Sequence, residues 1–181
     1  MSPRAASTGT LESKPATSVL PHSIAKSRTI GSANSVVNPS NTAFLTPLDV
    51  ILEQIPNELK QLNRWVVWKL TPRQNGKPTK IPFVATNPKI KASINDPTTW
   101  ATYNEAGDSY NSGGFSGIGF VLVATDDICG IDIDNCRDPG TGNLTETATN
   151  CLKTAQSYSE VSPSGTGIRI LLRGTLSGTR R

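Results

Sequence analysis

The sequence lacks several of the residues on which common active sites depend. Its single histidine, His22, lies in a low-complexity amino-terminal segment, so the rest of the chain has no histidine for a Ser-His-Asp triad, a metal site or acid-base catalysis. Cys129, Cys136 and Cys151 form no C-x-x-C pair, which argues against a disulfide framework and a zinc ribbon. We expect them to be small core residues. Any chemistry must therefore depend on carboxylates, basic side chains and metal.

Long apolar runs are also absent. No segment approaches the length of a membrane span, and no charged start followed by an apolar stretch marks a secretory signal. We therefore expect an intracellular, cytoplasmic protein without membrane contact. Residues 1–46 are rich in Ser, Thr, Ala, Asn and Pro and contain Glu12 as their only acid, which predicts a disordered tail. The same acid-poor composition, with Arg4 and Arg28, also fits an organelle transit peptide, so targeting stays open.

Residues 47–181 remain, and about 135 residues suffice for one domain with a real core. Apolar periodicity predicts two short helices or one broken helix in 48–62, a helix from Asp96 through Ala106 that Gly107 and Gly113-Gly114 stop, and a helix over 144–155. Strands are predicted over 64–70, 79–84, 117–124, 128–134, 158–161 and 168–173. This order predicts an α/β (α+β) fold, with a mainly antiparallel open sheet and helices on one face.

Two hairpins are expected in this sheet. Asn75-Gly76 is a strong turn signal and would pair strand 64–70 with strand 79–84. Thr125, Asp126 and Asp127 would join 117–124 to 128–134 as the central hairpin.

The most informative feature is a pair of carboxylates, Asp132 and Asp134, inside an apolar run. Side chains alternate along a strand, so both acids would leave the same face about 7 Å apart at their α-carbons, while Ile131 and Ile133 would face a core. A divalent cation, Mg²⁺ or Mn²⁺, would resolve their repulsion and supply the geometry used for nucleotidyl transfer. Two solvated acids on an open strand face would give the same pattern.

Charge changes sign along the chain. From Lys60 to Lys91 there are basic residues and no acid, whereas from Asp96 to Glu146 acids predominate. A cationic strip beside an acidic metal cluster suits a polyanion held against a cation, although two solvated surfaces would also segregate in this way. The residues around the predicted hairpin tip are candidates for nucleic-acid contacts, namely Arg73, Lys77 and Lys80.

A loop rich in serine and glycine, residues 162–167, precedes the last strand. Its glycines permit backbone N–H groups to point at an anion, and its hydroxyls add donors. It lacks the Gly-Lys-Ser/Thr ending of a Walker loop, and a plain hairpin loop would need no ligand. In the strand that follows, Arg169 and Arg173 point away from Ile168, Ile170 and Leu172. The candidate nucleotide-binding residues are Ser162, Ser164, Gly165, Thr166, Gly167 and Arg169.

Several ordered segments carry a resemblance. They are GIGFVL at 117–122, GIDIDNC at 130–136 and SEVSPSGTGIRI at 159–170, with RWVVWK at 64–69 and KPTKIPF at 77–83 before them. Together they resemble the amino-terminal domain of phage and plasmid primase-polymerases of the archaeo-eukaryotic primase superfamily. The similarity covers about residues 48–181.

This resemblance implies a core of the RNA-recognition-motif type. The family's first motif binds catalytic metals, which carries over to Asp132 and Asp134. Its second motif typically ends in a histidine that contacts the nucleotide's phosphates, and Arg169 stands there, as in part of the family. Because arginine does not transfer protons at neutral pH, we assign it phosphate binding. The family's third, acidic motif would follow Arg181, as would its accessory helical domain, so we expect the first part of a longer, truncated gene product.

The resemblance, together with the paired carboxylates, thus implies metal-dependent, template-directed nucleotidyl transfer for primer synthesis or DNA polymerisation in replication, weak or absent without the third motif. The resemblance implies Mg²⁺ or Mn²⁺ as cofactor. It implies DNA template and primer, nucleoside triphosphates and a fused or separate helicase as partners. A noncatalytic nucleic-acid-binding or nucleotide-binding module is the main alternative. A D-x-D glycosyltransferase is less favoured, since a sugar-nucleotide fold normally needs more chain.

Overall fold

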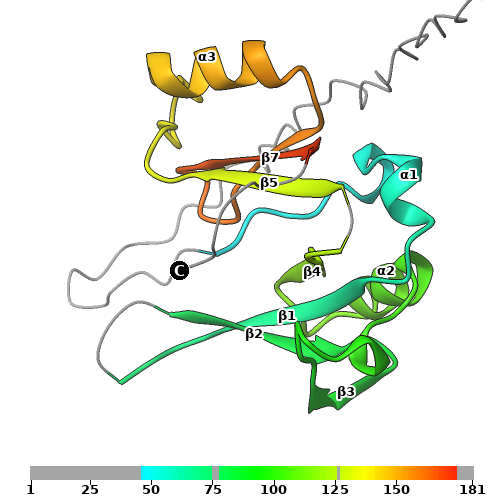
Figure 1. Cartoon of the computed structure of the whole chain (residues 1–181). Helices are drawn as coiled ribbons and strands as arrows, with labels where there is room; N and C mark the ends of the chain where they lie inside the picture. The colour runs from blue at the N-terminus through cyan, green and yellow to red at the C-terminus, as the bar shows by residue number, and fades with distance from the viewer. Residues whose placement is uncertain (1–45, 75–77, 126, 175–181) are drawn as a thin grey trace, which may run out of the picture.

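The computed structural model describes residues 46–74, 78–125 and 127–174 (Figure 1). It confirms an α+β fold with antiparallel sheets and few helices. The predicted tail, apart from Thr46, and the predicted Asn75-Gly76 turn lie outside the described residues. In chain order the elements are η1 (Leu52–Gln54), α1 (Asn57–Lys60), β1 (Trp65–Thr71), β2 (Thr79–Val84), β3 (Asn87–Lys91), η2 (Pro97–Thr99), α2 (Tyr103–Asn111), β4 (Gly117–Phe120), β5 (Ile128–Ile133), α3 (Glu146–Ala155), β6 (Ser159–Val161) and β7 (Ile168–Arg173).

The strands form two sheets rather than the one open sheet that we expected. Their orders are β3-β2-β1-β4 and β5-β7-β6. The predicted pairing of β1 with β2 is confirmed, with Val67 opposite Phe83. The predicted β4–β5 hairpin is wrong, because β4 pairs with β1 and β5 pairs with β7. Val121, which follows β4, is buried against Val66 and Ala92, so the chain leaves the first sheet there and crosses to the second.

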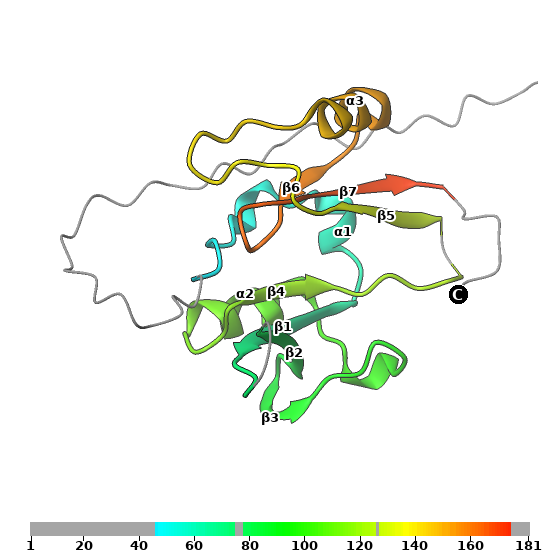
Figure 2. The same ribbon diagram turned by 90° about the vertical axis from the view of Figure 1, so that its left-hand side faces the viewer.

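The two sheets lie one above the other, with α3 above the second sheet and α2 beside the first sheet at the height of β4 (Figure 2). α3 packs on the second sheet through Ala148, Ile168 and Ile170, all of them buried. α2 packs against β1 and β4 of the first sheet. The face of β5 and β7 that we expected to be open is turned toward the first sheet, although Asp132 on this face is still exposed.

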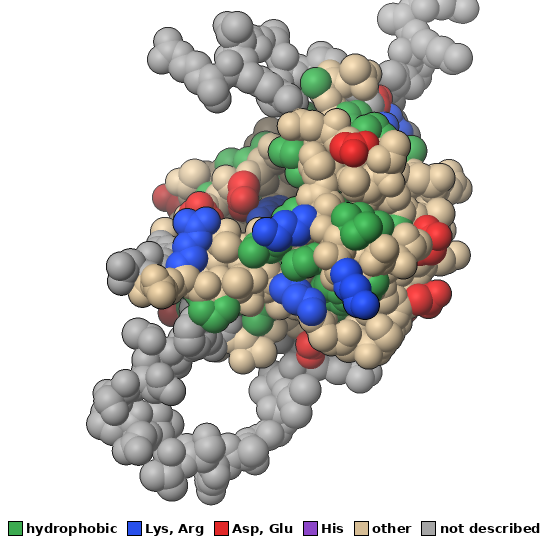
Figure 3. Space-filling model, turned by 90° about the horizontal axis from the view of Figure 1, so that it is seen from below, with side chains coloured by type: hydrophobic (Ala, Val, Ile, Leu, Met, Phe, Trp, Pro, Cys, Tyr) green, Lys and Arg blue, Asp and Glu red, His purple; other side chains and the backbone are tan. Residues whose placement is uncertain are grey.

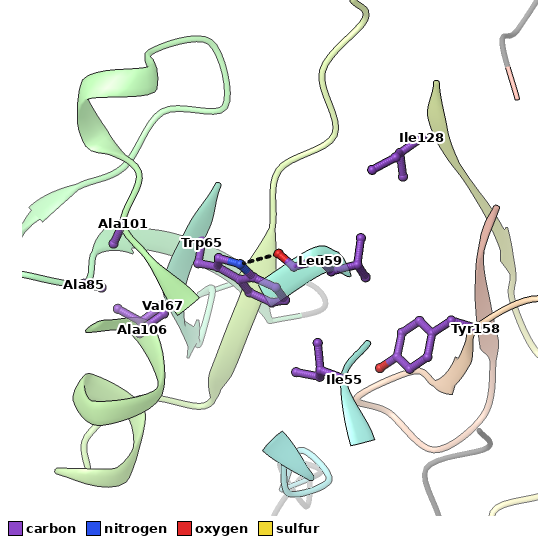
Figure 4. Close-up of a cluster of buried hydrophobic side chains, with 9 residues drawn as sticks. All are labelled: Ile55, Leu59, Trp65, Val67, Ala85, Ala101, Ala106, Ile128 and Tyr158. Carbon is purple, nitrogen blue, oxygen red and sulfur yellow. Dashed lines mark hydrogen bonds between the residues drawn. The ribbon is translucent and has the colours of Figure 1, made fainter. Parts of the chain in front are cut away.

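One apolar cluster joins the two sheets (Figure 4). Val67 comes from β1, Ala106 from α2 and Ile128 from β5, and Tyr158 directly precedes β6. Leu59, which is 1% exposed, lies between them, and its carbonyl accepts a hydrogen bond from the Trp65 indole N–H at 3.2 Å. Burial of these side chains supplies the main force that holds the sheets together.

The helix expected from Asp96 is divided in two. Asp96 caps a helix as predicted, since its carboxylate accepts the Thr98 N–H, but η2 ends at Thr99 because Ala101 pairs with Trp65 at the edge of β1. α2 then begins with a capping box between Thr102 and Glu105.

Gly107 lies inside α2 and does not stop it. The helix ends before Gly113 and Gly114, whose φ angles are positive as at many helix ends. In the described part of the chain no helix is both long and apolar enough to cross a membrane.

Candidate functional site

β5 presents Asp132 to the gap between the two sheets. Its neighbour Ile133 packs toward α3, so alternation turns Asp132 to the opposite face. Asp134 follows the strand directly and precedes Asn135, whose φ of 51° turns the chain. Both carboxylates are solvent-accessible.

A row of three charged side chains crosses the second sheet. Asp132 of β5, Arg169 of β7 and Glu160 of β6 stand directly opposite one another. Arg169 Nε lies 3.4 Å from Asp132 Oδ2, and Arg169 Nη1 lies 3.8 Å from Glu160 Oε1. The guanidinium of Arg169 is thus shared between two carboxylates, and neither contact is short enough to be a strong ion pair.

Glu160 has the most perturbed environment in this row. Burial raises the pKa of its carboxyl group, while the charge of Arg169 opposes that rise. The Tyr158 hydroxyl donates to Glu160 Oε2 at 3.2 Å, and burial together with this carboxylate raises the pKa of Tyr158. The phenol therefore stays protonated and acts as a hydrogen-bond donor.

The loop at 162–167 is closed by its own hydrogen bonds. The Ser162 hydroxyl accepts the Gly167 N–H at 3.0 Å, and the Ser162 carbonyl accepts the Gly165 N–H at 2.8 Å. Arg137 donates to the Gly165 carbonyl at 2.8 Å. The amides of Gly165 and Gly167 are therefore used inside the loop. The hydroxyls of Ser164 and Thr166, 2.9 Å apart, remain as groups that an anion could reach.

This loop lies beside the end of β5. A Cβ on Gly167 would lie 2.8 Å from the Ile133 carbonyl oxygen and 3.5 Å from the Asp134 α-carbon, so only glycine permits the approach. The fold thus brings the loop, Asp134, Asp132 and Arg169 together, although they are distant in sequence.

A cavity of about 570 Å³ lies between the sheets. The first sheet contributes Trp68, Lys80, Pro82 and Gly119 to its lining, and the second contributes Asp132, Glu160, Arg169 and Leu171. Much of the remaining lining is apolar and comes from the segment before β1 and from β4. Such a site suits a ligand with one charged and one apolar part.

The basic strip of the sequence does not form one surface. Lys80 lines the cavity, whereas the ammonium group of Lys69 lies over the Phe83 and Phe115 rings. Arg73 is exposed beyond the end of β1, and Lys77 lies outside the described residues. Figure 3 shows Lys and Arg side chains in the middle of the face seen from below, with Asp and Glu mostly toward its edges.

The donor set at Asp132 and Asp134 suits a hard cation. Mg²⁺ prefers oxygen ligands and is often held by one or two carboxylates together with substrate phosphates and water, so the residues present fit it, and Mn²⁺ likewise. Among the described residues no group of three or more His, Cys, Asp or Glu side chains is placed to hold a metal. Asp127 pairs with Arg173 at the other end of β5, and β7 separates Glu160 from β5.

No family model matches the chain. Over 129 residues the chain is 37% identical to the DNA primase-polymerase of Nitratiruptor phage NrS-1. The chain is therefore related to a phage DNA primase-polymerase. The alignment spans 70% of this chain and 17% of the phage protein, so the chain corresponds to a small part of that primase-polymerase.

Sequence reasoning missed two features of the site. Alternation along Tyr158–Val161 could have placed Glu160 on one face with Arg169, but the pairing of β6 with β7 had first to be known. The G-x-G pattern of β4 signals a close approach, and Trp68 is the residue that fills it.

Proposed function

We propose that this chain is the nucleotidyl-transfer domain of a phage-type or plasmid-type DNA primase-polymerase, acting in template-directed primer synthesis or DNA polymerisation. The observation that carries the proposal is that Asp132 and Arg169 line one cavity, with Asp134 and the 162–167 loop directly beside the end of β5. Relationship to the phage protein supports it independently.

Each residue has a role that its chemistry permits. Asp132 and Asp134 would hold Mg²⁺ or Mn²⁺, which when bound stabilises charge developing on the reacting phosphate. The guanidinium of Arg169 binds phosphate oxygens through paired donors. Ser164 and Thr166 offer hydroxyl donors beside it. By binding the triphosphate at several points, these side chains align its α-phosphate for attack by the primer's 3′ oxygen.

A noncatalytic nucleotide-binding module is the second candidate. The observation in its favour is that Asp132 and Asp134 have no third carboxylate beside them among the described residues. Two ligands bind a cation but restrain its position less well than three, and nucleotidyl transfer depends on fixed geometry. We therefore expect nucleotide binding to be clear and primer extension to be slow.

Calorimetry and primer extension together test the proposal. Wild-type protein should bind a nonhydrolysable deoxynucleoside triphosphate with Mn²⁺, and Asp132→Asn with Asp134→Asn should abolish binding because both carboxylate charges are lost. Asp108→Asn removes an exposed acid of α2 and is the matched control, with binding unchanged. With a primed template, only the wild type and the control should add nucleotides.

The outcomes separate the two candidates. Binding with no detectable extension would favour the noncatalytic module. Equal binding by the double variant would show that the two aspartates do not form the metal site.

A further inference from the structure

Lys80 enters the cavity from the wall opposite the charged row. It stands on β2 opposite Leu70, and two positions along the strands Trp68 stands opposite Pro82. Its ammonium nitrogen lies 5.3 Å from the centroid of the Trp68 ring. Lys80, Trp68 and Pro82 all line the cavity, so the lysine stem and the indole form one part of its wall.

Trp68 is a fixed support for this lysine. The indole N–H donates to the Ile118 carbonyl at 3.0 Å, and the side chain is 8% exposed. Cation–π attraction to a held indole restricts where the ammonium group can lie. Lys80 therefore loses less freedom on meeting a ligand than a lysine extended into solvent would.

The charges around Lys80 suggest what that ligand is. Arg169 already has two carboxylate neighbours, whereas Lys80 has no carboxylate within ion-pair distance in the described part of the chain. Burial and the charge of Arg169 lower the pKa of Lys80, and Asp132, Glu160 and Asp134 oppose this. Two cations thus face one another across a cavity, and an anion between them would remove their repulsion.

The other lysines of the strip that the structure describes do not share this position. Lys69 lies over Phe83 and Phe115. Lys89 and Lys91 belong to the fully exposed strand β3, at the edge of the first sheet. In the described residues, Lys80 and Arg169 are the basic side chains that line the cavity.

We propose that Lys80, held on Trp68, binds the phosphate tail of the nucleotide from the wall opposite Arg169, instead of binding the template backbone. This inference rests on the proposed function, because it needs a nucleotide in the cavity. It adds a residue that positions the triphosphate from the first sheet, so that both sheets grip the substrate.

Lys80→Met tests the inference, because methionine keeps an unbranched apolar stem on Trp68 and removes the charge. With Mn²⁺ present, we expect the affinity for a nonhydrolysable deoxynucleoside triphosphate to fall about tenfold or more, the scale of one lost contact to a charged group. The affinity for the corresponding monophosphate should fall less, because its tail is shorter. Lys80→Arg should restore most of the triphosphate affinity, and Lys91→Met, the matched control on β3, should bind as wild type.

Single-stranded DNA binding, measured on the same variants, distinguishes the alternatives. Lys80→Met should leave DNA affinity unchanged. If DNA affinity falls and triphosphate affinity does not, Lys80 is a template contact and the inference is wrong. If the wild type binds triphosphate and Lys80→Met binds it equally, the inference fails while the proposed function stands. Absence of wild-type triphosphate binding would overturn both.

Discussion

Trp68 shows how a single aromatic residue shapes the wall of the cavity. A Cβ built on Gly117 of β4 would lie 2.7 Å from Trp68 Cζ2, and one on Gly119 would lie 3.7 Å from Trp68 Cδ1. Only glycine at 117 leaves room for the ring in its present position. The indole therefore lies close to β4, where its N–H reaches the Ile118 carbonyl.

Gly117→Ala should displace this ring. We expect a loss of about 1–3 kcal/mol of unfolding free energy, the usual cost of overpacking a filled site. The shift of Trp68 should also change the intrinsic fluorescence of the native state. Gly107→Ala is the matched control, because a Cβ there meets Leu52 Cδ1 at an ordinary 3.6 Å inside a helix. That change should stabilise the protein by about 0.5–1 kcal/mol. Equal unfolding midpoints in urea for all three proteins would contradict this account.

At this scale the sequence predicts side-chain direction better than it predicts partners. Alternation correctly turns Asp132 and Arg169 away from the faces that Ile133, Ile168 and Ile170 bury against α3. Arg169 stands opposite Asp132 because of the register in which β5 pairs with β7. This register could not be predicted from the sequence. The direction of Lys80 could not be predicted either, because β2 has half-buried side chains along most of its length.

The hairpin of β1 with β2 was predicted well, whereas the pairing of strands that lie far apart in the sequence was not. The β1–β2 hairpin and α3 appear where turn signals and apolar periodicity placed them. The error at β4 has a physical cause. Its apolar run continues to Val123, but Val121 and Val123 pack against Val66 of β1 and against Ala92, which follows β3, instead of extending a hairpin. A continuous apolar run does not reveal which neighbour buries it.

The β1–β2 hairpin carries the remaining nucleic-acid prediction. If Arg73 and Lys77 contact phosphates of single-stranded DNA, two contacts contribute about −1.4 to the slope of log affinity against log salt, at about −0.7 for each phosphate. Replacing both by alanine should flatten the slope by that amount, as fluorescence anisotropy at several salt concentrations would show. Lys153→Ala, an exposed lysine of α3, should leave the slope as it is. If the double variant leaves the slope unchanged, Arg73 and Lys77 do not contact DNA phosphates and are only solvated.

At the scale of the whole described fold, two sheets lie one above the other and the candidate site is between them. One apolar cluster holds them together through Leu59, Ile128 and Tyr158, and the Asp132 row lies further along the second sheet, where the cavity is found. The α+β class followed from the sequence, because it depends on local periodicity. The division into two sheets did not, because β1 with β4 and β5 with β7 are long-range pairs.

The central claim is that metal and nucleotide bind together in this cavity, and Mn²⁺ provides a direct measurement. Bound Mn²⁺ broadens the NMR signals of nearby amides. With a nonhydrolysable deoxynucleoside triphosphate, broadening should centre on Asp132 and Asp134, include Thr166 and Arg169, and reach Lys80 across the gap. Signals of α3 beyond the second sheet should stay sharper, and Asp132→Asn with Asp134→Asn should remove the effect. Broadening centred on other acids, such as Asp96 or Asp138, or persisting in the double variant, would contradict the account.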